Sequence, residues 1–216
     1  MDDASSVFDA SILTGPIANY PVADSFNRRR ERDYSTGDIP HVLVGSFVVD
    51  LPMGDERRFA PMGVAGAIVN NWTITGVMTR QSGVPIAITQ ATNFNAFAGF
   101  GIARPNLVSD PELEAHQRSV ARWFDTSAFA TAPQFTLGSS SRNPVRGPSY
   151  RNWDLALIRR VRIGGTTALE LRAEVFNVAN TPPLGPPNGV FGSAAFGTIT
   201  SAGDPRVVQL AVKIYF

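Results

Sequence analysis

Hydrophobic and polar residues alternate strictly at the end of this chain. From Arg206 onward the sequence reads RVVQLAVKIYF. One face of this segment is apolar and carries Val208, Leu210, Val212, Ile214 and Phe216. A period of two residues predicts a β-strand with one hydrophobic face. The run is long for a soluble protein, in which strands most often have about 5–6 residues.

Four other segments repeat this pattern at a similar length. In residues 150–163, for example, Trp153, Leu155 and Leu157 share one face, on which Arg159 is the exception. Each segment is close to the ~9–11 residues that a tilted transmembrane strand requires. The predicted strands comprise residues 40–51, 71–82, 150–163, 167–178 and 206–216.

The connections between these strands alternate in length. Gly164-Gly165 predicts a tight hairpin, and residues 52–71 form a linker of moderate length. The other connections are long, and they comprise residues 1–39, roughly 90–149, and 179–205. A transmembrane barrel with extended loops on one side alternates in this way, whereas a compact sandwich tolerates few long loops without structure. The sequence therefore predicts an all-β fold of antiparallel strands, forming the C-terminal part of a transmembrane β-barrel with long extracellular loops.

One short surface helix is expected within a loop, at residues 110–124. Asp110 can cap its first turn, Pro111 suits the first helical position, and Glu112 and Glu114 oppose the helix dipole. The two long stretches without charge, residues 59–79 and 181–203, are interrupted by Pro or Asn. Neither stretch predicts a membrane-spanning helix.

Composition narrows the class further. The 216 residues carry 19 basic and 18 acidic side chains, so the formal net charge of +1 gives no support for nucleic-acid binding. Charged residues make up 17% of the chain, below the ~25% of an average soluble domain. The sequence contains no Cys, which excludes disulfides, thiolate metal sites and a Cys nucleophile.

Enzyme chemistry finds no support in the sequence. His41 and His116 have no partner at a metal-ligand spacing, and Gly99-Phe100-Gly101 lacks the third glycine of a dinucleotide fingerprint. No nucleophile elbow, P-loop or zinc-protease motif occurs. We therefore expect no catalytic residue, no metal ligand and no cofactor.

Charged residues alternate on the strands beside the Gly164-Gly165 hairpin. Their structural interpretation is a solvated ladder that stabilises the hairpin across the two strands. In a barrel, the same ladder would face the lumen. Its members are Arg160, Arg162, Glu170, Arg172 and Glu174.

A second charged run, Arg28-Arg29-Arg30-Glu31-Arg32-Asp33, interleaves acids with bases. This interleaving favours a solvated or lipopolysaccharide-facing loop over a nucleic-acid contact.

The last strand resembles the C-terminal signal of bacterial outer-membrane β-barrels. Apolar residues stand at alternate positions from Val208 and finish in Phe216. In those proteins the barrel-assembly machinery recognises this strand. Tyr often stands where this chain has Ile214, and here Tyr215 is its neighbour. The resemblance implies that the five alternating apolar residues form an assembly signal.

Nearly the whole chain resembles the end of a TonB-dependent receptor. The similarity is to the large Oar-like kind, which has a carboxypeptidase-regulatory-like N-terminal domain. The motifs follow one another in order along the chain. They include Asp2-Asp3-Ala4-Ser5, Val49-Asp50-Leu51-Pro52-Met53-Gly54, Asn71-Trp72-Thr73-Ile74-Thr75-Gly76, Gln81-Ser82-Gly83-Val84-Pro85, Arg104-Pro105-Asn106, Trp123-Phe124-Asp125, Ser141-Arg142-Asn143-Pro144-Val145-Arg146-Gly147-Pro148, Asn152-Trp153-Asp154-Leu155 and Arg172-Ala173-Glu174-Val175-Phe176-Asn177.

This resemblance implies about five strands of a barrel that has about 22 strands in the family, with its lumen closed by a plug domain. The implied location is the outer membrane of a Gram-negative-type bacterium, and the implied activity is energy-coupled import of a metal chelate, saccharide or peptide. The implied partners are the remaining strands and the plug, the TonB energy-coupling protein, the barrel-assembly machinery and outer-membrane lipid. The loops at 90–149 and 179–205 are expected to capture ligand. Because the plug, energy-coupling segment and signal peptide are absent from these residues, we expect a fragment or a mis-called start.

Two alternatives stay open on the residues alone. A secreted β-sandwich that binds carbohydrate would fold as a soluble monomer. An outer-membrane enzyme would need a Ser/His/Asp or paired-carboxylate constellation, for which the sequence offers no convincing candidate.

Overall fold

The computed structural model describes residues 27–54, 59, 61–90 and 103–216, and the chain forms two compact units. The sheet unit comprises residues 41–81, 150–183 and 203–216. The loop unit comprises residues 1–40, 82–149 and 184–202, as far as these are described. The long connections thus gather into a unit of their own.

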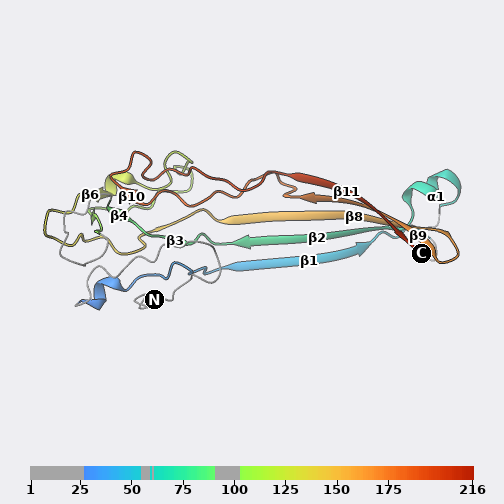
Figure 1. Ribbon diagram of the computed structural model, residues 1–216, viewed down its shortest axis with the longest axis horizontal. Coiled ribbons are helices and arrows are strands. Elements are labelled where there is room, and N and C mark those ends of the chain that lie inside the picture. Colours follow the sequence, from blue (N-terminus) through green and yellow to red (C-terminus); the bar gives the residue numbers. More distant parts are fainter. Residues whose placement is uncertain (1–26, 55–58, 60, 91–102) are drawn as a thin grey trace. The chain divides into compact units, whose positions relative to one another are not determined.

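The sheet unit contains a five-stranded antiparallel sheet in the order β1-β2-β8-β9-β11 (Figure 1). Each strand overlaps one of the five predicted ranges, and the prediction of an all-β antiparallel fold is confirmed. The strands are β1 (Val42–Asp50), β2 (Trp72–Gln81), β8 (Tyr150–Gly164), β9 (Thr167–Phe176) and β11 (Val207–Tyr215).

The register of the sheet brings the apolar sides of all five strands together. Leu157 of β8 lies opposite Ile74 of β2 and Ala173 of β9, and Ala173 lies opposite Leu210 of β11. Because side chains alternate between the two sides of a strand, this row fixes the side on which every other residue lies. We call this side the apolar face. Its members are Leu43, Gly45, Phe47, Val49, Trp72, Ile74, Gly76, Met78, Arg80, Arg151, Trp153, Leu155, Leu157, Arg159, Val161, Leu169, Leu171, Ala173, Val175, Val208, Leu210, Val212 and Ile214.

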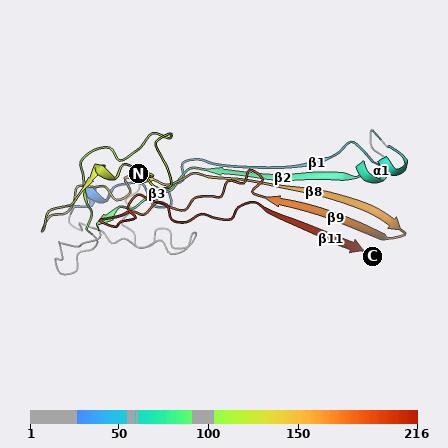
Figure 2. The same cartoon turned by 90° about the horizontal axis from the view of Figure 1, so that it is seen from above.

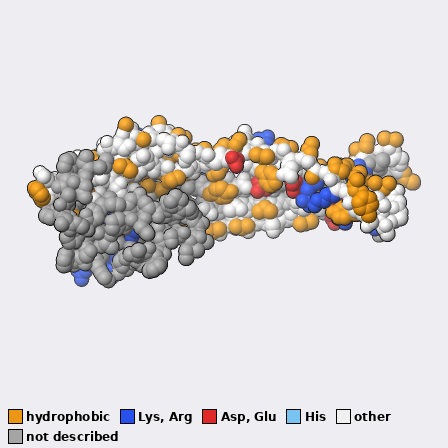
Figure 3. All heavy atoms as spheres, in the orientation of Figure 1, with side chains coloured by type: hydrophobic (Ala, Val, Ile, Leu, Met, Phe, Trp, Pro, Cys, Tyr) orange, Lys and Arg blue, Asp and Glu red, His pale blue; other side chains and the backbone are white. Residues whose placement is uncertain are grey.

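The other side, which we call the polar face, carries the Thr, Asn, Gln and Asp residues of β2 and β8 and the charged ladder of β8 and β9. Acidic and basic side chains are visible among hydrophobic ones on the strands in Figure 3.

The apolar face is open. Leu210 is 78% exposed and Val212 is 65% exposed, and the five strands form a single layer (Figure 2). Among the described residues, β1 and β11 each pair on one side only, so both edges of the sheet are unpaired. In water, such a surface and two such edges would promote aggregation. The exposed apolar face is therefore suited to a nonaqueous environment.

Glycine at position 76 lets an aromatic ring lie across the apolar face. A Cβ added at Gly76 would come 2.4 Å from the ring of Phe47, its partner on β1, and 2.8 Å from Leu155 on β8. Any side chain here would displace the ring or its neighbour.

The β8–β9 hairpin closes through two residues, Gly165 and Thr166, between the paired Gly164 and Thr167. Gly165 has φ +55°, a left-handed conformation that glycine adopts without strain. The β1–β2 connection contains α1 (Gly63–Val69), a helix that the sequence did not predict. None of the helices in the described residues is long and apolar enough to cross a membrane.

The loop unit has a small aromatic core. Phe124 has no exposed surface, and its ring meets Phe129 and Phe196 edge to face at centroid distances of 5.8 Å and 5.1 Å. Ile88 and Val145 pack against the same cluster. The described residues of this unit also form three two-stranded pairs and two 3-10 helices: β3 (Pro85–Ile86) with β7 (Val145–Arg146), β4 (Thr89–Gln90) with β10 (Val190–Phe191), β5 (Asn106–Leu107) with β6 (Phe129–Ala130), η1 (Arg28–Glu31) and η2 (Thr126–Ala128).

The helix expected at residues 110–124 does not form, and that prediction is wrong. The Asp110 carboxylate accepts a hydrogen bond from the Glu112 amide at 2.9 Å, as an N-cap residue would, but no helix follows it. Further along, the Asp125 amide bonds to the Pro111 carbonyl, which folds the segment back on itself. Asp125 instead caps η2, where hydrogen bonds from Ser127 and Arg122 hold the pKa of its carboxyl below the ordinary value.

The charged run at residues 28–33 is not simply solvated, which corrects the expectation from sequence. Glu31 is buried and forms an ion pair with Arg104 at 2.5 Å. Asp33 is also buried and accepts a hydrogen bond from the Asn143 amide at 2.6 Å. The reason is tertiary, because the partners lie more than 70 residues away along the chain.

Candidate functional site

The charged ladder is centred on Glu170, which lies on the polar face of β9 close to the β8–β9 hairpin. The register places Glu170 directly opposite Arg160 on β8 and Lys213 on β11. Its carboxylate accepts a hydrogen bond from the Arg160 guanidinium at 3.0 Å. The Tyr215 hydroxyl donates to the same oxygen at 3.1 Å, and the Arg160 guanidinium lies 4.9 Å from the centre of the Tyr215 ring. Glu170 is consequently 7% exposed although it stands on an open sheet face.

Arg172 extends the ladder along β9. Its guanidinium donates to Glu174 at 3.3 Å and lies 3.8 Å from Glu170. Because acidic and basic residues alternate along this face of the strand, each charged side chain lies next to one of the opposite charge. The ladder is a connected network rather than a set of independent surface charges.

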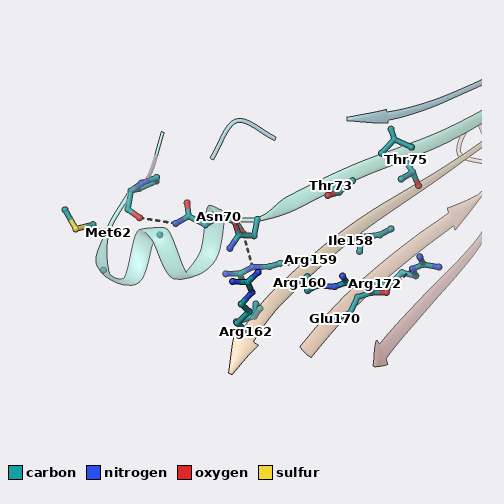
Figure 4. Close-up of a pocket in the computed structure, with 16 residues that line it drawn as sticks. Met62, Asn70, Thr73, Thr75, Ile158, Arg159, Arg160, Arg162, Glu170 and Arg172 are labelled. Carbon is teal, nitrogen blue, oxygen red and sulfur yellow. Dashed lines mark hydrogen bonds and ion pairs between the residues drawn. The ribbon is translucent and has the colours of Figure 1, made fainter. Parts of the chain in front are cut away.

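Beside the ladder lies a concavity of about 1060 Å³. Its wall on the sheet is formed by β1, β2, β8 and β9, and its other wall by α1 and the residues that flank it (Figure 4). The charged lining residues are Arg159, Arg160, Arg162, Glu170 and Arg172. Four guanidiniums against one carboxylate make the concavity basic.

Hydrogen bonds to the backbone anchor α1 at the end of the sheet. The Asn70 side chain donates to the Pro61 carbonyl at 3.1 Å, and the Asn70 carbonyl accepts from Arg159 Nε at 3.1 Å (Figure 4). The Trp72 indole donates to the Ile68 carbonyl at 2.7 Å. Gly66 is required here, because an added Cβ would lie 1.9 Å from the Pro61 carbonyl oxygen.

This arrangement suits electrostatic binding of an anionic group. Within the described residues, no group of three or more His, Cys, Asp or Glu side chains could hold a metal ion. Exposed guanidiniums, by contrast, are the preferred protein ligands for carboxylate and phosphate groups. The polar face can therefore hold an acidic partner segment or anion.

The structure brings most of the predicted ladder together. Arg160, Glu170, Arg172 and Glu174 form the network above, all on the polar face. Arg162 shares that face, but it lies opposite Ala168 and has no ion pair among the described residues. That this face lines a lumen stays a prediction at this point.

The predicted assembly residues lie on the apolar face of β11, as far as that strand extends. Val208, Leu210, Val212 and Ile214 are all exposed there, and Phe216 follows the strand with 93% of its surface exposed. Their recognition by an assembly machinery stays a prediction.

The expected ligand-capturing loops fall mostly within the loop unit, but residues 179–183 and 203–205 belong to the sheet unit. Residues 91–102 lie outside the described residues. So do the motifs at Asp2-Asp3-Ala4-Ser5 and Gly99-Phe100-Gly101.

Sequence reasoning missed the supports of the ladder. Tyr215 and Arg160 come from strands that are not adjacent, and only the register across β9 reveals their contact. The α1 anchor was missed because a seven-residue helix is too short to show a clear period. The pairing of Arg159 with Trp72 was detectable in part, since Arg159 interrupts an otherwise apolar alternation.

Comparison with known proteins gives one finding. Residues 1–209 match the model of a family described as an outer membrane beta barrel domain. Neither the curated proteins nor the solved structures give a match.

Proposed function

This chain belongs to the outer-membrane β-barrel domain family, and on that premise we propose that it is the C-terminal part of a TonB-dependent receptor that imports a nutrient. Family membership places the protein in the outer membrane of a Gram-negative-type bacterium. The apolar face is then the lipid-facing side of the barrel wall, and the polar face is the side toward the lumen.

The observation that carries the proposal is a charged polar face on a sheet with two open edges. A small closed barrel of about eight strands fills its interior with packed side chains. Here, the Arg160 side chain is 61% exposed, and it lines the basic concavity together with Arg162 and Arg172. Such a wall fits a wide barrel, in which further strands pair with β1 and β11 and a separate plug domain occupies the lumen.

Energy coupling would act on that plug, through the TonB protein. The folded loop unit offers a defined extracellular surface for capture of a metal chelate, saccharide or peptide. Among the alternatives, the secreted β-sandwich is overturned by the family match and by the sheet itself, which carries no second sheet on either face in the described residues.

Energy dependence of uptake is the direct test. The full-length protein should be produced in its host, and uptake measured for a labelled ferric chelate, an oligosaccharide and an oligopeptide. We expect uptake of one of these probes to fall to background when the gene for this protein is deleted. We expect the same loss when TonB is absent or when a protonophore collapses the proton gradient.

A strain that carries the gene on a plasmid controls for effects on neighbouring genes. Uptake that needs this protein but continues in the protonophore would identify a passive channel. If deletion of the gene reduces the uptake of none of the three probes, the protein does not import nutrients of these three classes. Either outcome contradicts the proposal.

We also propose that the apolar residues of β11, together with Phe216 directly after it, are the signal that the barrel-assembly machinery recognises. Deleting Phe216 from the full-length protein should reduce its outer-membrane level several-fold, because the machinery loses the terminal aromatic group. Quantitative blotting of membrane fractions measures this. The substitution Lys213→Ala, on the polar face of the same strand, should leave the level unchanged. Normal insertion after deletion would refute the assembly role.

A further inference from the structure

The apolar face carries a few charged residues, and all of them are basic. Every charged residue on it is an arginine, and these residues are Arg80, Arg151 and Arg159. No acidic side chain shares the face. The face turns toward lipid, where a charge near the middle of the bilayer is costly. Each arginine therefore requires a partner at the level where it stands.

Arg159 has its partner within the protein. Its Nε donates to the Asn70 carbonyl, and its guanidinium lies 5.5 Å from the centre of the Trp72 ring, on the same face. This arginine stands near the end of the sheet that carries α1 and the β8–β9 hairpin.

Arg80 and Arg151 stand at the other end and are different. They are directly opposite each other on β2 and β8, so that two like charges occupy a cross-strand pair. Both side chains are exposed, and neither forms an ion pair or side-chain hydrogen bond within the described residues. Like charges in this position repel and destabilise a sheet. An anion bound between the two guanidiniums would attract both of them, so that the pair would stabilise the sheet instead of destabilising it.

The position of the pair identifies the membrane leaflet. Gln81 and Tyr150 adjoin the pair, and between them runs the long segment of the loop unit. In outer-membrane barrels the longer loops are extracellular and the short turns periplasmic. Arg151 and Arg159 are eight residues apart on β8, roughly 26 Å along a strand and roughly 20 Å along the membrane normal at a typical tilt. This is slightly less than the apolar band of about 25 Å, so both arginines can extend their long side chains to the headgroup levels at opposite ends of the face.

Trp153 strengthens the assignment. It lies on the apolar face two residues further into the bilayer than Arg151 on the same strand, and it is 48% exposed. An aromatic ring at this depth is typical of the interfacial girdle of a membrane barrel. Arginine at the headgroup level and tryptophan just below it match a ligand with a phosphate above and an acyl chain beneath.

We propose that Arg80 and Arg151 form a binding site for a phosphate group of lipopolysaccharide, the phosphorylated glycolipid of the outer leaflet. The two guanidiniums hold one phosphate between them through charge-assisted hydrogen bonds, and Trp153 packs against an acyl chain. The planar guanidinium suits a phosphate because it can donate two parallel hydrogen bonds.

The full-length protein, purified in detergent and freed of bound lipid, tests this site. Native mass spectrometry should measure the binding of bisphosphorylated lipid A, of enzymatically dephosphorylated lipid A, of phosphatidylethanolamine and of inorganic phosphate. We expect lipid A to bind at least about tenfold more tightly than its dephosphorylated form. We expect weak binding of inorganic phosphate, because the acyl contact is then missing. Equal binding of both lipid A forms would overturn the proposal without any variant.

The double substitution Arg80→Gln/Arg151→Gln should remove this preference for the phosphorylated form. Lys213→Gln, on the polar face of β11, removes a charge outside the site and should keep it. A preference that survives the double substitution, or that Lys213→Gln abolishes equally, would contradict the site. Heat-modifiable migration on gels verifies that each variant is folded. If the double variant does not fold, Trp153→Ala should still weaken lipid A binding, and unchanged binding would count against the proposal.

Discussion

Replacing Leu157 by Arg should strongly reduce the amount of this protein in the outer membrane. Leu157 lies in the middle row of the apolar face, between Ile74 and Ala173, on the central strand β8. Arginine on the lipid side of a barrel costs about 2–4 kcal/mol near the bilayer midplane. A loss of this size is a large fraction of the stability of an average protein domain, about 5–15 kcal/mol.

The neighbouring residue supplies a matched control. Ala156→Arg introduces the same side chain one position earlier, on the polar face opposite Glu174 and Thr75. A charge there meets a carboxylate and water, so the variant should reach the membrane at nearly the wild-type level. Urea unfolding of the full-length protein in lipid vesicles gives the free energies, and blotting of membrane fractions gives the levels. Equal losses in both variants would show that the two faces do not differ as described.

Replacing Phe124 by Ala should unfold much of the loop unit while the sheet remains intact. Phe124 is fully buried and contacts two other phenyl rings, and a Phe→Ala change in a core costs about 3–5 kcal/mol. Three short strand pairs and a small core hold this unit together, so a loss of that size exceeds what the remaining contacts can offset. On intact cells, added protease should cleave the loop segments of the variant much faster than those of the wild type.

Phe135→Ala is the control for this experiment. Phe135 lies in the same unit but is 66% exposed, so its truncation creates no cavity. Heat-modifiable migration should be retained in both variants, because the sheet unit contains neither residue. Protection of the Phe124→Ala loops at the wild-type level would mean that the aromatic cluster does not hold the unit together.

The strands could be predicted from sequence because alternation is a local property. Each of the five segments has its own apolar and polar sides, and any pairing that mixed them would expose polar groups to lipid. The short elements of the loop unit escaped prediction for the opposite reason. Two-residue strands such as β4 and β10 have no period, and only their partners define them. The helix expected at residues 110–124 does not form, because hydrogen bonds between this segment's backbone and distant residues outweigh the capping residues at its start.

The charged ladder was predicted as a set of residues and only partly as a set of contacts. Arg160 and Glu170 were predictable partners, because a two-residue hairpin fixes the register close to it. Tyr215 was not a predictable partner of Glu170. A long connection separates β9 from β11 along the chain, and its length does not determine the register in which the two strands pair.

The sequence by itself determined that this chain forms long antiparallel strands with one apolar side each, and that long and short connections alternate. These features depend on the order of residues within one strand or one turn, which the chain fixes locally. Only the tertiary structure decided which residues stand opposite one another. Several of these contacts join segments that are distant along the chain. They are the cross-strand pair of Arg80 and Arg151, the contacts that bury Glu170, and the ion pair of Glu31 with Arg104. Their energies depend on distances of a few ångströms, which local sequence patterns do not contain.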